Sequence, residues 1–140
     1  MAENPQAAPA RPRPLSPHLT IYRWPVTMAT SITHRVTGVG LAFGTIVLAW
    51  WLVAIASGPE PYRAFLGMSS AWPGQLVLFG LAWALAYHLL NGIRHLAWDL
   101  GYGFGVKTAA ALSWTVILAS AALAVAFFAL AYSGYGGFLR

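Results

Sequence analysis

The chain has no cysteine and very few charged residues, and both shortages narrow what it can be. Without cysteine it can form no disulfide, and it supplies no thiolate to a zinc ion or an iron–sulfur cluster. Any redox chemistry here must therefore use an organic cofactor or a haem held by histidine. Asp, Glu, Lys and Arg make up 8% of the residues, against about 25% in a soluble domain. A soluble globular fold is not expected.

Charge is missing altogether from three stretches, residues 36–59, 64–93 and 108–139. Each is longer than the roughly 20 residues that a helix needs to cross a bilayer core. We therefore expect an all-α integral membrane protein whose three transmembrane helices form part of a helix bundle. The three spans are expected over residues 28–57, 72–100 and 108–132.

The few basic residues predict how the chain crosses the membrane. Those before or at the first span and around the second connection are Arg11, Arg13, Arg23, Arg35, Arg94 and Lys107. The first connection, residues 58–70, is expected to be an external loop in which Glu60 and Arg63 cancel. The positive-inside rule then puts the N-terminus in the cytoplasm and the C-terminus outside. Residues 1–27 would form a cytoplasmic tail and interfacial segment before a membrane domain over residues 28–140. The chain has no basic cluster, so nucleic-acid binding is not expected.

The second span carries polar residues deep in its apolar run. Successive residues of an α-helix turn by about 100°, so His88, His95 and Asp99 share one face. Gly92, one turn from His88 on nearly the same face, removes side-chain bulk there. At 1.5 Å per residue, His88 lies roughly 20–25 Å from the outer start of the helix, and His95 about 10 Å nearer the inner surface. The face predicts a buried ligand with room beside it for a flat group.

Placing a polar side chain in lipid costs free energy, so such residues usually face the interior of a helix bundle, where they have a functional role. A neutral imidazole ligates haem iron, whereas a lone intramembrane histidine could equally well only hydrogen-bond another helix. Because Gly92, Arg94 and His95 are nearby, we favour the interpretation of His88 as a ligand. Asp99 is expected to form a structural ion pair with His95 or Arg94.

The start of the first span carries a second polar group. Ser31 and Arg35 are four residues apart and share a face, with His34 beside it. Arg35 is the last charge before a long apolar run, so its guanidinium is expected at the inner edge of the hydrocarbon. A hydroxyl and a guanidinium there could hydrogen-bond a quinone carbonyl or a haem propionate. An anchoring charge preceded by a capping serine would have the same spacing.

Other residues have expected structural roles. His18 lies outside the spans and is expected in solvent or at an interface. The third span, rich in Ala and Ser and without charge or histidine, is expected to be scaffold. The first span has small residues at a spacing typical of close helix packing, namely Gly38, Gly40 and Gly44.

Three stretches together carry a resemblance to a known family. They read RPLSPHLTIY at residues 13–22, SITHRVTG at 31–38 and HLLNGIRHLAWD at 88–99. With the three-span layout, they make the chain resemble the cytochrome b556 subunits of succinate dehydrogenase, one of the two membrane anchors of respiratory complex II. The resemblance covers nearly the whole chain after the tail, and the second and third stretches are specific in combination.

The resemblance implies a role for each site residue. The position matching His88 is an axial ligand to the iron of a single haem b, and a second anchor subunit supplies the other ligand. The positions matching His34, Arg35 and His95 lie near the haem propionates. Those matching Ser31 and Arg35 help form the ubiquinone site beside the iron–sulfur subunit. The resemblance also implies a flavoprotein partner and a location in the bacterial inner membrane, with a periplasmic C-terminus.

On this interpretation the chain passes electrons from succinate to ubiquinone within an enzyme that it does not form alone, since it lacks a flavin-binding motif and cysteine. One alternative is the anchor of a related fumarate reductase. A proton or solute conduit would need a polar path, yet the outer halves of all three spans lack ionisable residues. A two-haem cytochrome would need four intramembrane ligands. The chain has only four histidines, with His18 outside the spans and His34 at the inner edge.

Overall fold

The computed structural model describes residues 23–134, and nearly all of them are helical. The helices in chain order are α1 (Val26–Ala56), α2 (Pro59–Ser70), α3 (Trp72–Asp99) and α4 (Val106–Gly134). Of these, α1, α3 and α4 are long and apolar enough to cross a membrane. They begin and end within two residues of the three expected spans, which confirms the all-α architecture with three membrane-spanning helices. His18 and most of the N-terminal segment lie outside the described residues.

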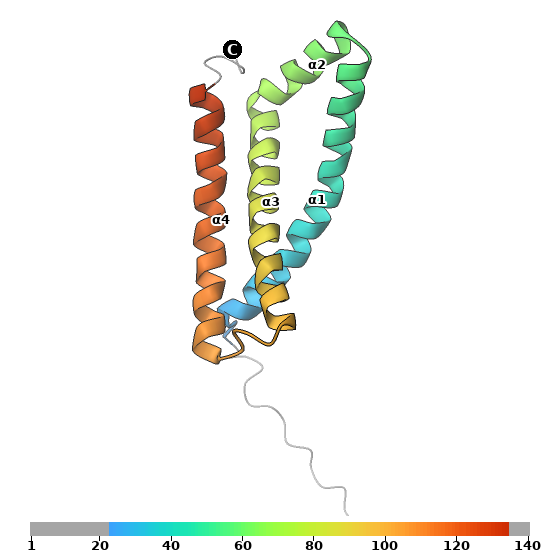
Figure 1. Ribbon diagram of the computed structural model, residues 1–140. Helices are drawn as coiled ribbons and strands as arrows, with labels where there is room; N and C mark the ends of the chain where they lie inside the picture. The colour runs from blue at the N-terminus through green and yellow to red at the C-terminus, as the bar shows by residue number, and fades with distance from the viewer. Residues whose placement is uncertain (1–22, 135–140) are drawn as a thin grey trace, which may run out of the picture.

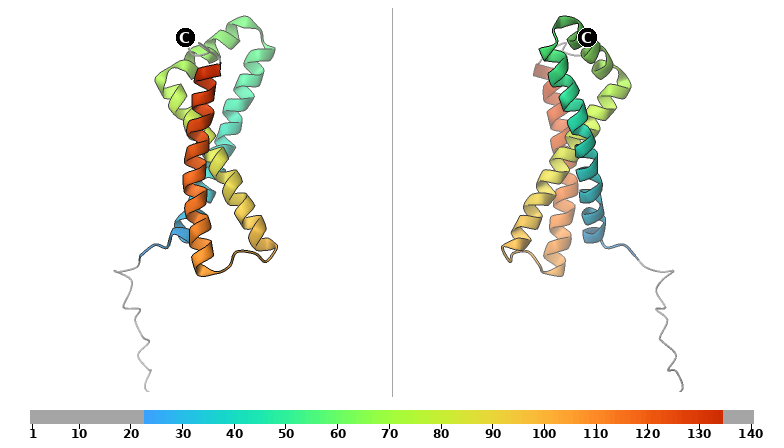
Figure 2. Two further views of the ribbon diagram at one scale, coloured as in Figure 1. Left: turned by 60° about the vertical axis from the view of Figure 1, so that its left-hand side comes forward. Right: turned by 90° about the vertical axis from the view of Figure 1, so that its right-hand side faces the viewer.

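The spanning helices cross rather than run parallel. Figure 1 shows α3 and α4 side by side, with α1 on the other side of α3. The further views show α1 and α3 crossing near their middle, so that they separate toward both ends, and α2 joins them at one of these (Figure 2). We call that end, with α2, the apical end. The basal end holds the start of α1 at Val26 and the turn between α3 and α4, residues 100–105.

The connection at the apical end is helical, so the expectation of a loop over residues 58–70 is wrong. Gly58 has a φ of 105°, a conformation that glycine adopts readily, and it separates α1 from α2. Pro59 then begins α2, where its missing N–H costs no helical hydrogen bond. Glu60 and Arg63, one turn apart, form an ion pair at 2.8 Å. The Gly58–Pro59 pair therefore ends one helix and also starts the next, short one.

Glycines let α1 approach α3. A Cβ added at Gly38 would lie 3.0 Å from Cε1 of His88, and one at Gly44 would overlap Leu81. A Cβ at Gly40 would meet nothing within 4 Å. The prediction of close packing is therefore confirmed at two of the three positions, and it is wrong at Gly40, which faces away from the contact.

The helix α4 packs against α3 through small residues, as expected of a scaffold. Its buried side chains repeat every three or four positions and are Ser113, Val116, Ser120 and Ala124. Large apolar side chains cover the outward surfaces of α1, α3 and α4. Such surfaces suit a bilayer, in which helices satisfy their own backbone hydrogen bonds and present apolar groups to lipid.

Candidate functional site

The crossing of α1 over α3 brings three histidines together. His34 stacks on His88 with ring centroids 3.8 Å apart and an interplanar angle of 13°. His95 meets His34 edge-on, at a centroid distance of 5.1 Å. We call His34, His88 and His95 the histidine cluster. His34 was expected nearer the membrane edge than His88, and this is wrong. It lies eight residues into α1, about 12 Å from the start of the helix, and shares the depth of His88.

His88 is held by hydrogen bonds at one ring nitrogen. Its Nδ1 lies 3.2 Å from the carbonyl oxygen of His34 and 3.4 Å from Oγ1 of Thr37. The Thr37 hydroxyl donates to the same carbonyl at 3.0 Å, so its oxygen can still accept. Because a carbonyl only accepts, Nδ1 is the donor in this bond, and in a neutral imidazole Nε2 then keeps its lone pair. A metal-ligating histidine commonly has this arrangement, with one nitrogen oriented by a backbone carbonyl and the other free for the metal.

The surroundings of the cluster suit a group from outside the chain. A Cβ added at Gly92 would meet nothing within 4 Å, so the open space expected one turn from His88 is present. Nδ1 of His34 is buried and has no hydrogen-bond partner among residues 23–134. Buried polar atoms are rarely left unpaired, so this nitrogen indicates a polar partner that another molecule supplies.

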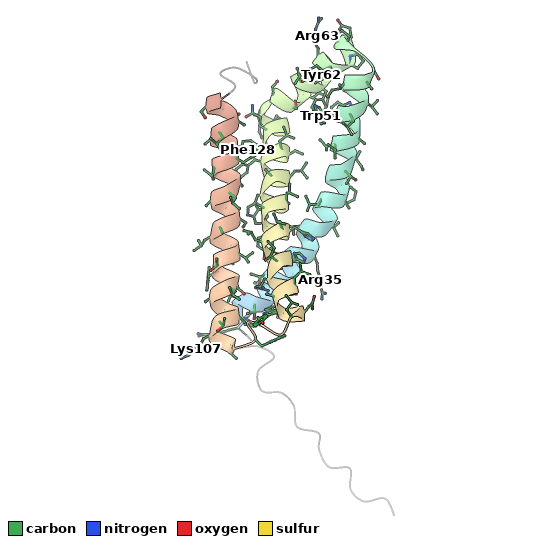
Figure 3. All side chains as sticks on the ribbon, in the orientation of Figure 1. Arg35, Trp51, Tyr62, Arg63, Lys107 and Phe128 are labelled. Carbon is green, nitrogen blue, oxygen red and sulfur yellow. The ribbon has the colours of Figure 1, made fainter. Side chains whose placement is uncertain are left out.

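Ser31 and Arg35 lie one turn apart near the start of α1. Ser31 is half-buried and Arg35 is exposed, and neither side chain hydrogen-bonds another residue of the described chain. Figure 3 shows Arg35 toward the basal end, with its side chain pointing away from the bundle. The sequence prediction that both share one face, with His34 beside them, agrees with the helix. A hydroxyl and a guanidinium are thus available to an external group at the rim of the histidine cluster.

The ion pair expected of Asp99 does not form. Within residues 23–134 the one salt bridge lies in α2, at the apical end, and Asp99 is exposed at the end of α3. Arg94 is five residues earlier, so it points about 140° away around the helix. The ring of His95 stacks instead on Trp98, with centroids 5.2 Å apart.

A buried polar network lies beside the cluster, and the sequence pattern did not reveal it. Arg94, expected to flank the second connection, is only 4% exposed. Its Nη1 donates to Oγ1 of Thr30 at 3.0 Å and to Oγ of Ser113 at 2.5 Å, and its guanidinium lies 4.4 Å from the ring centroid of Trp98. The hydroxyl of Tyr87 donates to the Thr30 carbonyl at 2.9 Å. Hydroxyl residues within apolar stretches are a sequence signal for such a network, but only the crossing of the helices shows which of them contact Arg94.

Comparison with known proteins shows the family of this chain. The model of the succinate dehydrogenase/fumarate reductase transmembrane subunit matches residues 9–127. The succinate dehydrogenase cytochrome b556 subunit of Paracoccus denitrificans is 44% identical over 113 residues, which cover 81% of this chain and 87% of that protein. The chain belongs to the succinate dehydrogenase/fumarate reductase transmembrane subunit family.

Other members of this family are similar over comparable lengths. The cytochrome b556 subunit of Rickettsia felis is 42% identical over 108 residues, covering 77% of this chain and 84% of that protein. The mitochondrial cytochrome b560 subunit of Mus musculus is 42% identical over 96 residues, or 67% of this chain and 57% of that protein. The region matched by the family model includes the histidine cluster, Ser31, Arg35 and Arg94.

Proposed function

We propose that the chain is the membrane-anchoring, haem b-binding subunit of a succinate:ubiquinone oxidoreductase, which joins the tricarboxylic acid cycle to the respiratory chain. The observation that carries the proposal is the hydrogen bond from Nδ1 of His88 to the His34 carbonyl, which leaves Nε2 free inside a membrane span. Relatives named as cytochrome b556 and b560 subunits support a b-type haem. The chain acts within an assembly that includes a second anchor subunit, an iron–sulfur subunit and a flavoprotein subunit.

The residues of the histidine cluster fit a haem. Nε2 of His88 would ligate the iron, and the group would supply one-electron transfer when bound. His34, Arg35 and His95 would lie near the propionates. Among residues 23–134, the buried Nδ1 of His34 has no hydrogen-bond partner and Arg35 has no ion-pair partner, and both suit anionic carboxylates.

The stacked rings support one shared haem rather than two ligands from this chain. For both histidines to hold one iron, a nitrogen of each ring would have to be directed at a common point between the two rings. The rings of His34 and His88 lie face to face at 3.8 Å instead, so they do not form such a pair. The other ligand to the iron would then come from the second anchor subunit, and a two-haem cytochrome is disfavoured.

Ser31 and Arg35 would form part of the ubiquinone site. The Ser31 hydroxyl would donate a hydrogen bond to a quinone carbonyl, and the Arg35 guanidinium would stabilise the negative charge that develops on a quinone oxygen during reduction. Ubiquinone takes up two electrons and two protons to become ubiquinol. The electrons would come from succinate through the flavoprotein and iron–sulfur subunits, which would dock at the basal end.

Charge supports the orientation in a bacterial inner membrane. Figure 3 shows Arg35 and Lys107 toward the basal end and Arg63 at the apical end. Arg23 directly precedes α1 and adds to the basal charge, whereas Glu60 neutralises Arg63. The positive-inside rule then places the basal end in the cytoplasm and the C-terminus in the periplasm.

Two alternatives predict different behaviour. A proton or solute conduit is disfavoured because the apical halves of α1, α3 and α4 contain no charged side chain and no histidine. A fumarate reductase anchor would share the family and the site. Comparing succinate:ubiquinone turnover with quinol:fumarate turnover of the assembled complex separates that anchor from the proposed one.

Replacing His88 with alanine tests the haem assignment. We expect the assembled complex to lose its low-spin b-type spectrum, because the iron loses the axial ligand from this chain. Reduced-minus-oxidised spectra and the pyridine haemochrome content measure the loss. Leu89→Ala, which truncates the exposed neighbour on α3, is the control and should keep the spectrum. An unchanged low-spin spectrum in His88→Ala would remove the assignment.

Replacing Arg35 with alanine tests the quinone assignment. Ubiquinone reduction should fall by about tenfold or more, while succinate oxidation by an artificial acceptor that reacts upstream should change little. Arg63→Ala, an exposed arginine at the apical end, is the matched control. Equal losses in both assays would contradict a quinone role for Arg35.

A further inference from the structure

Arg94 is a buried cation that the proposed haem and quinone roles do not use. Of the two acids among residues 23–134, Glu60 pairs with Arg63 at the other end of the bundle, and Asp99 is exposed and lies on a different face of α3. Arg94 thus has no carboxylate partner in the described chain. A buried charge in a membrane is expensive, and replacing such groups with apolar ones often costs no stability. The position of Arg94 therefore needs an explanation other than stability.

Hydrogen bonds from Arg94 and Tyr87 of α3 meet at one residue of α1, Thr30. Thr30 is 1% exposed, and its hydroxyl accepts from Arg94 at 3.0 Å. The Thr30 carbonyl accepts from the Tyr87 hydroxyl at 2.9 Å. Ser113 of α4 accepts from Arg94 at 2.5 Å and lies 3.4 Å from the Thr30 hydroxyl. We call Thr30, Tyr87, Arg94 and Ser113 the Thr30 clamp, which ties three helices together at the start of α1.

The Thr30 clamp lies next to the proposed quinone residues. Thr30 directly precedes Ser31, and Arg35 follows about 7.5 Å further along the same helix. An α-helix is stiff over this length, so the rotation and depth of Thr30 set the direction of both side chains. We infer that Arg94 is a positioning residue, which through Thr30 fixes the first turns of α1 and so presents Ser31 and Arg35 to ubiquinone. This inference rests on the proposed quinone role of those two residues.

An arginine suits this task better than a lysine. Nη1 alone reaches two hydroxyls, on α1 and α4, while Cζ of the guanidinium lies over the Trp98 ring, 4.4 Å from its centroid. The ring and the two hydroxyls together define the orientation of the group. A lysine would keep the charge and could bond a hydroxyl, but it lacks the planar fork that stacks on an aromatic face. Arg94→Lys should therefore rescue part of the function that Arg94→Leu loses.

Two serines of α4 provide a matched test in the assembled complex. Ser113 and Ser120 are both fully buried, and each hydroxyl donates to a carbonyl of its own helix, of Ala109 and Ile117 respectively. Only Ser113 also accepts from Arg94. Ser113→Ala should therefore loosen the clamp, and Ser120→Ala should not.

The measurement is steady-state reduction of a short-chain ubiquinone, normalised to haem content. We expect the KM for this quinone to rise about three- to tenfold in Ser113→Ala and Arg94→Lys, and more in Arg94→Leu, with kcat for an upstream acceptor unchanged. Tyr87→Phe should give a smaller rise, because the Thr30 carbonyl keeps its helical hydrogen bond. Ser120→Ala should retain the wild-type KM.

A merely structural network would lower the amount of assembled complex and leave the KM per haem unchanged, and that result would overturn the inference. If Arg94→Leu fails to assemble, Ser113→Ala and Tyr87→Phe decide, since each removes hydrogen bonds of the clamp and keeps Arg94. A wild-type KM in both would refute positioning. If Arg35→Ala leaves quinone reduction unchanged, the quinone assignment itself fails. If Arg35→Ala impairs quinone reduction and the clamp variants do not, only the positioning inference fails.

Discussion

Replacing Gly38 with alanine tests how closely α1 holds the proposed haem ligand. The new Cβ would lie 3.0 Å from Cε1 of His88 and 3.6 Å from Nδ1. Carbon atoms prefer separations of about 3.5–4.0 Å, so the imidazole must move by about 0.5 Å. The bond from Nδ1 to the His34 carbonyl, already 3.2 Å long, would weaken as the ring turns. We therefore expect lower haem occupancy, and altered low-spin EPR g values in the haem that remains.

The effect on stability should be small, because two contributions oppose each other. Removing a glycine from a helix interior favours folding by about 0.8–1 kcal/mol, while overpacking costs about 1–3 kcal/mol. The net loss should thus be about 0–2 kcal/mol, measured by thermal unfolding of the complex. Gly40→Ala, on the same helix, is the control, since a Cβ at that position would meet nothing within 4 Å. Identical haem spectra in Gly38→Ala and Gly40→Ala would refute the close contact between α1 and His88.

Two further predictions concern single side chains. Thr37→Val removes one acceptor near Nδ1–H of His88 and makes the imidazole less electron-rich, so the haem midpoint potential should rise in a redox titration. Thr45→Val, which removes a hydroxyl bonded only to its own helix, should leave the potential as in the wild type, and an equal shift in both would count against the contact. Glu60→Ala breaks a largely exposed ion pair and should change the free energy of unfolding by less than about 0.5 kcal/mol. A larger loss in thermal unfolding would mean that α2 depends on this pair.

Part of the site is local in the sequence, and that part could be predicted. The helical period alone gives the shared face of His88, Gly92 and His95, and the open space at Gly92 agrees with it. The predictions that failed concern Arg94, Asp99 and the depth of His34. For Arg94 and His34 the outcome depends on which helix packs beside the residue, and the pattern within one helix does not contain that information. The five-residue spacing of Arg94 and Asp99, in contrast, already puts them on different faces of α3.

The prediction of a loop between the first two spans was wrong for a different reason. A glycine followed by proline breaks a helix, but the same pair can start the next one, because proline is tolerated in the first turn. The twelve residues of α2 are too few and too polar to form an apolar span. Their helical structure was therefore outside what the hydropathy pattern could show.

The sequence by itself determined that the chain is helical, that three segments can cross a membrane, and that His88 lies deep in the second of them. These properties depend on the apolar character and the period of neighbouring residues. Only the tertiary structure decided that His34 stacks on His88, 54 positions away, and that Arg94 reaches Thr30 and Ser113. Such contacts depend on the tilt and rotation of whole helices, which the packing of Gly38 and Gly44 against α3 sets.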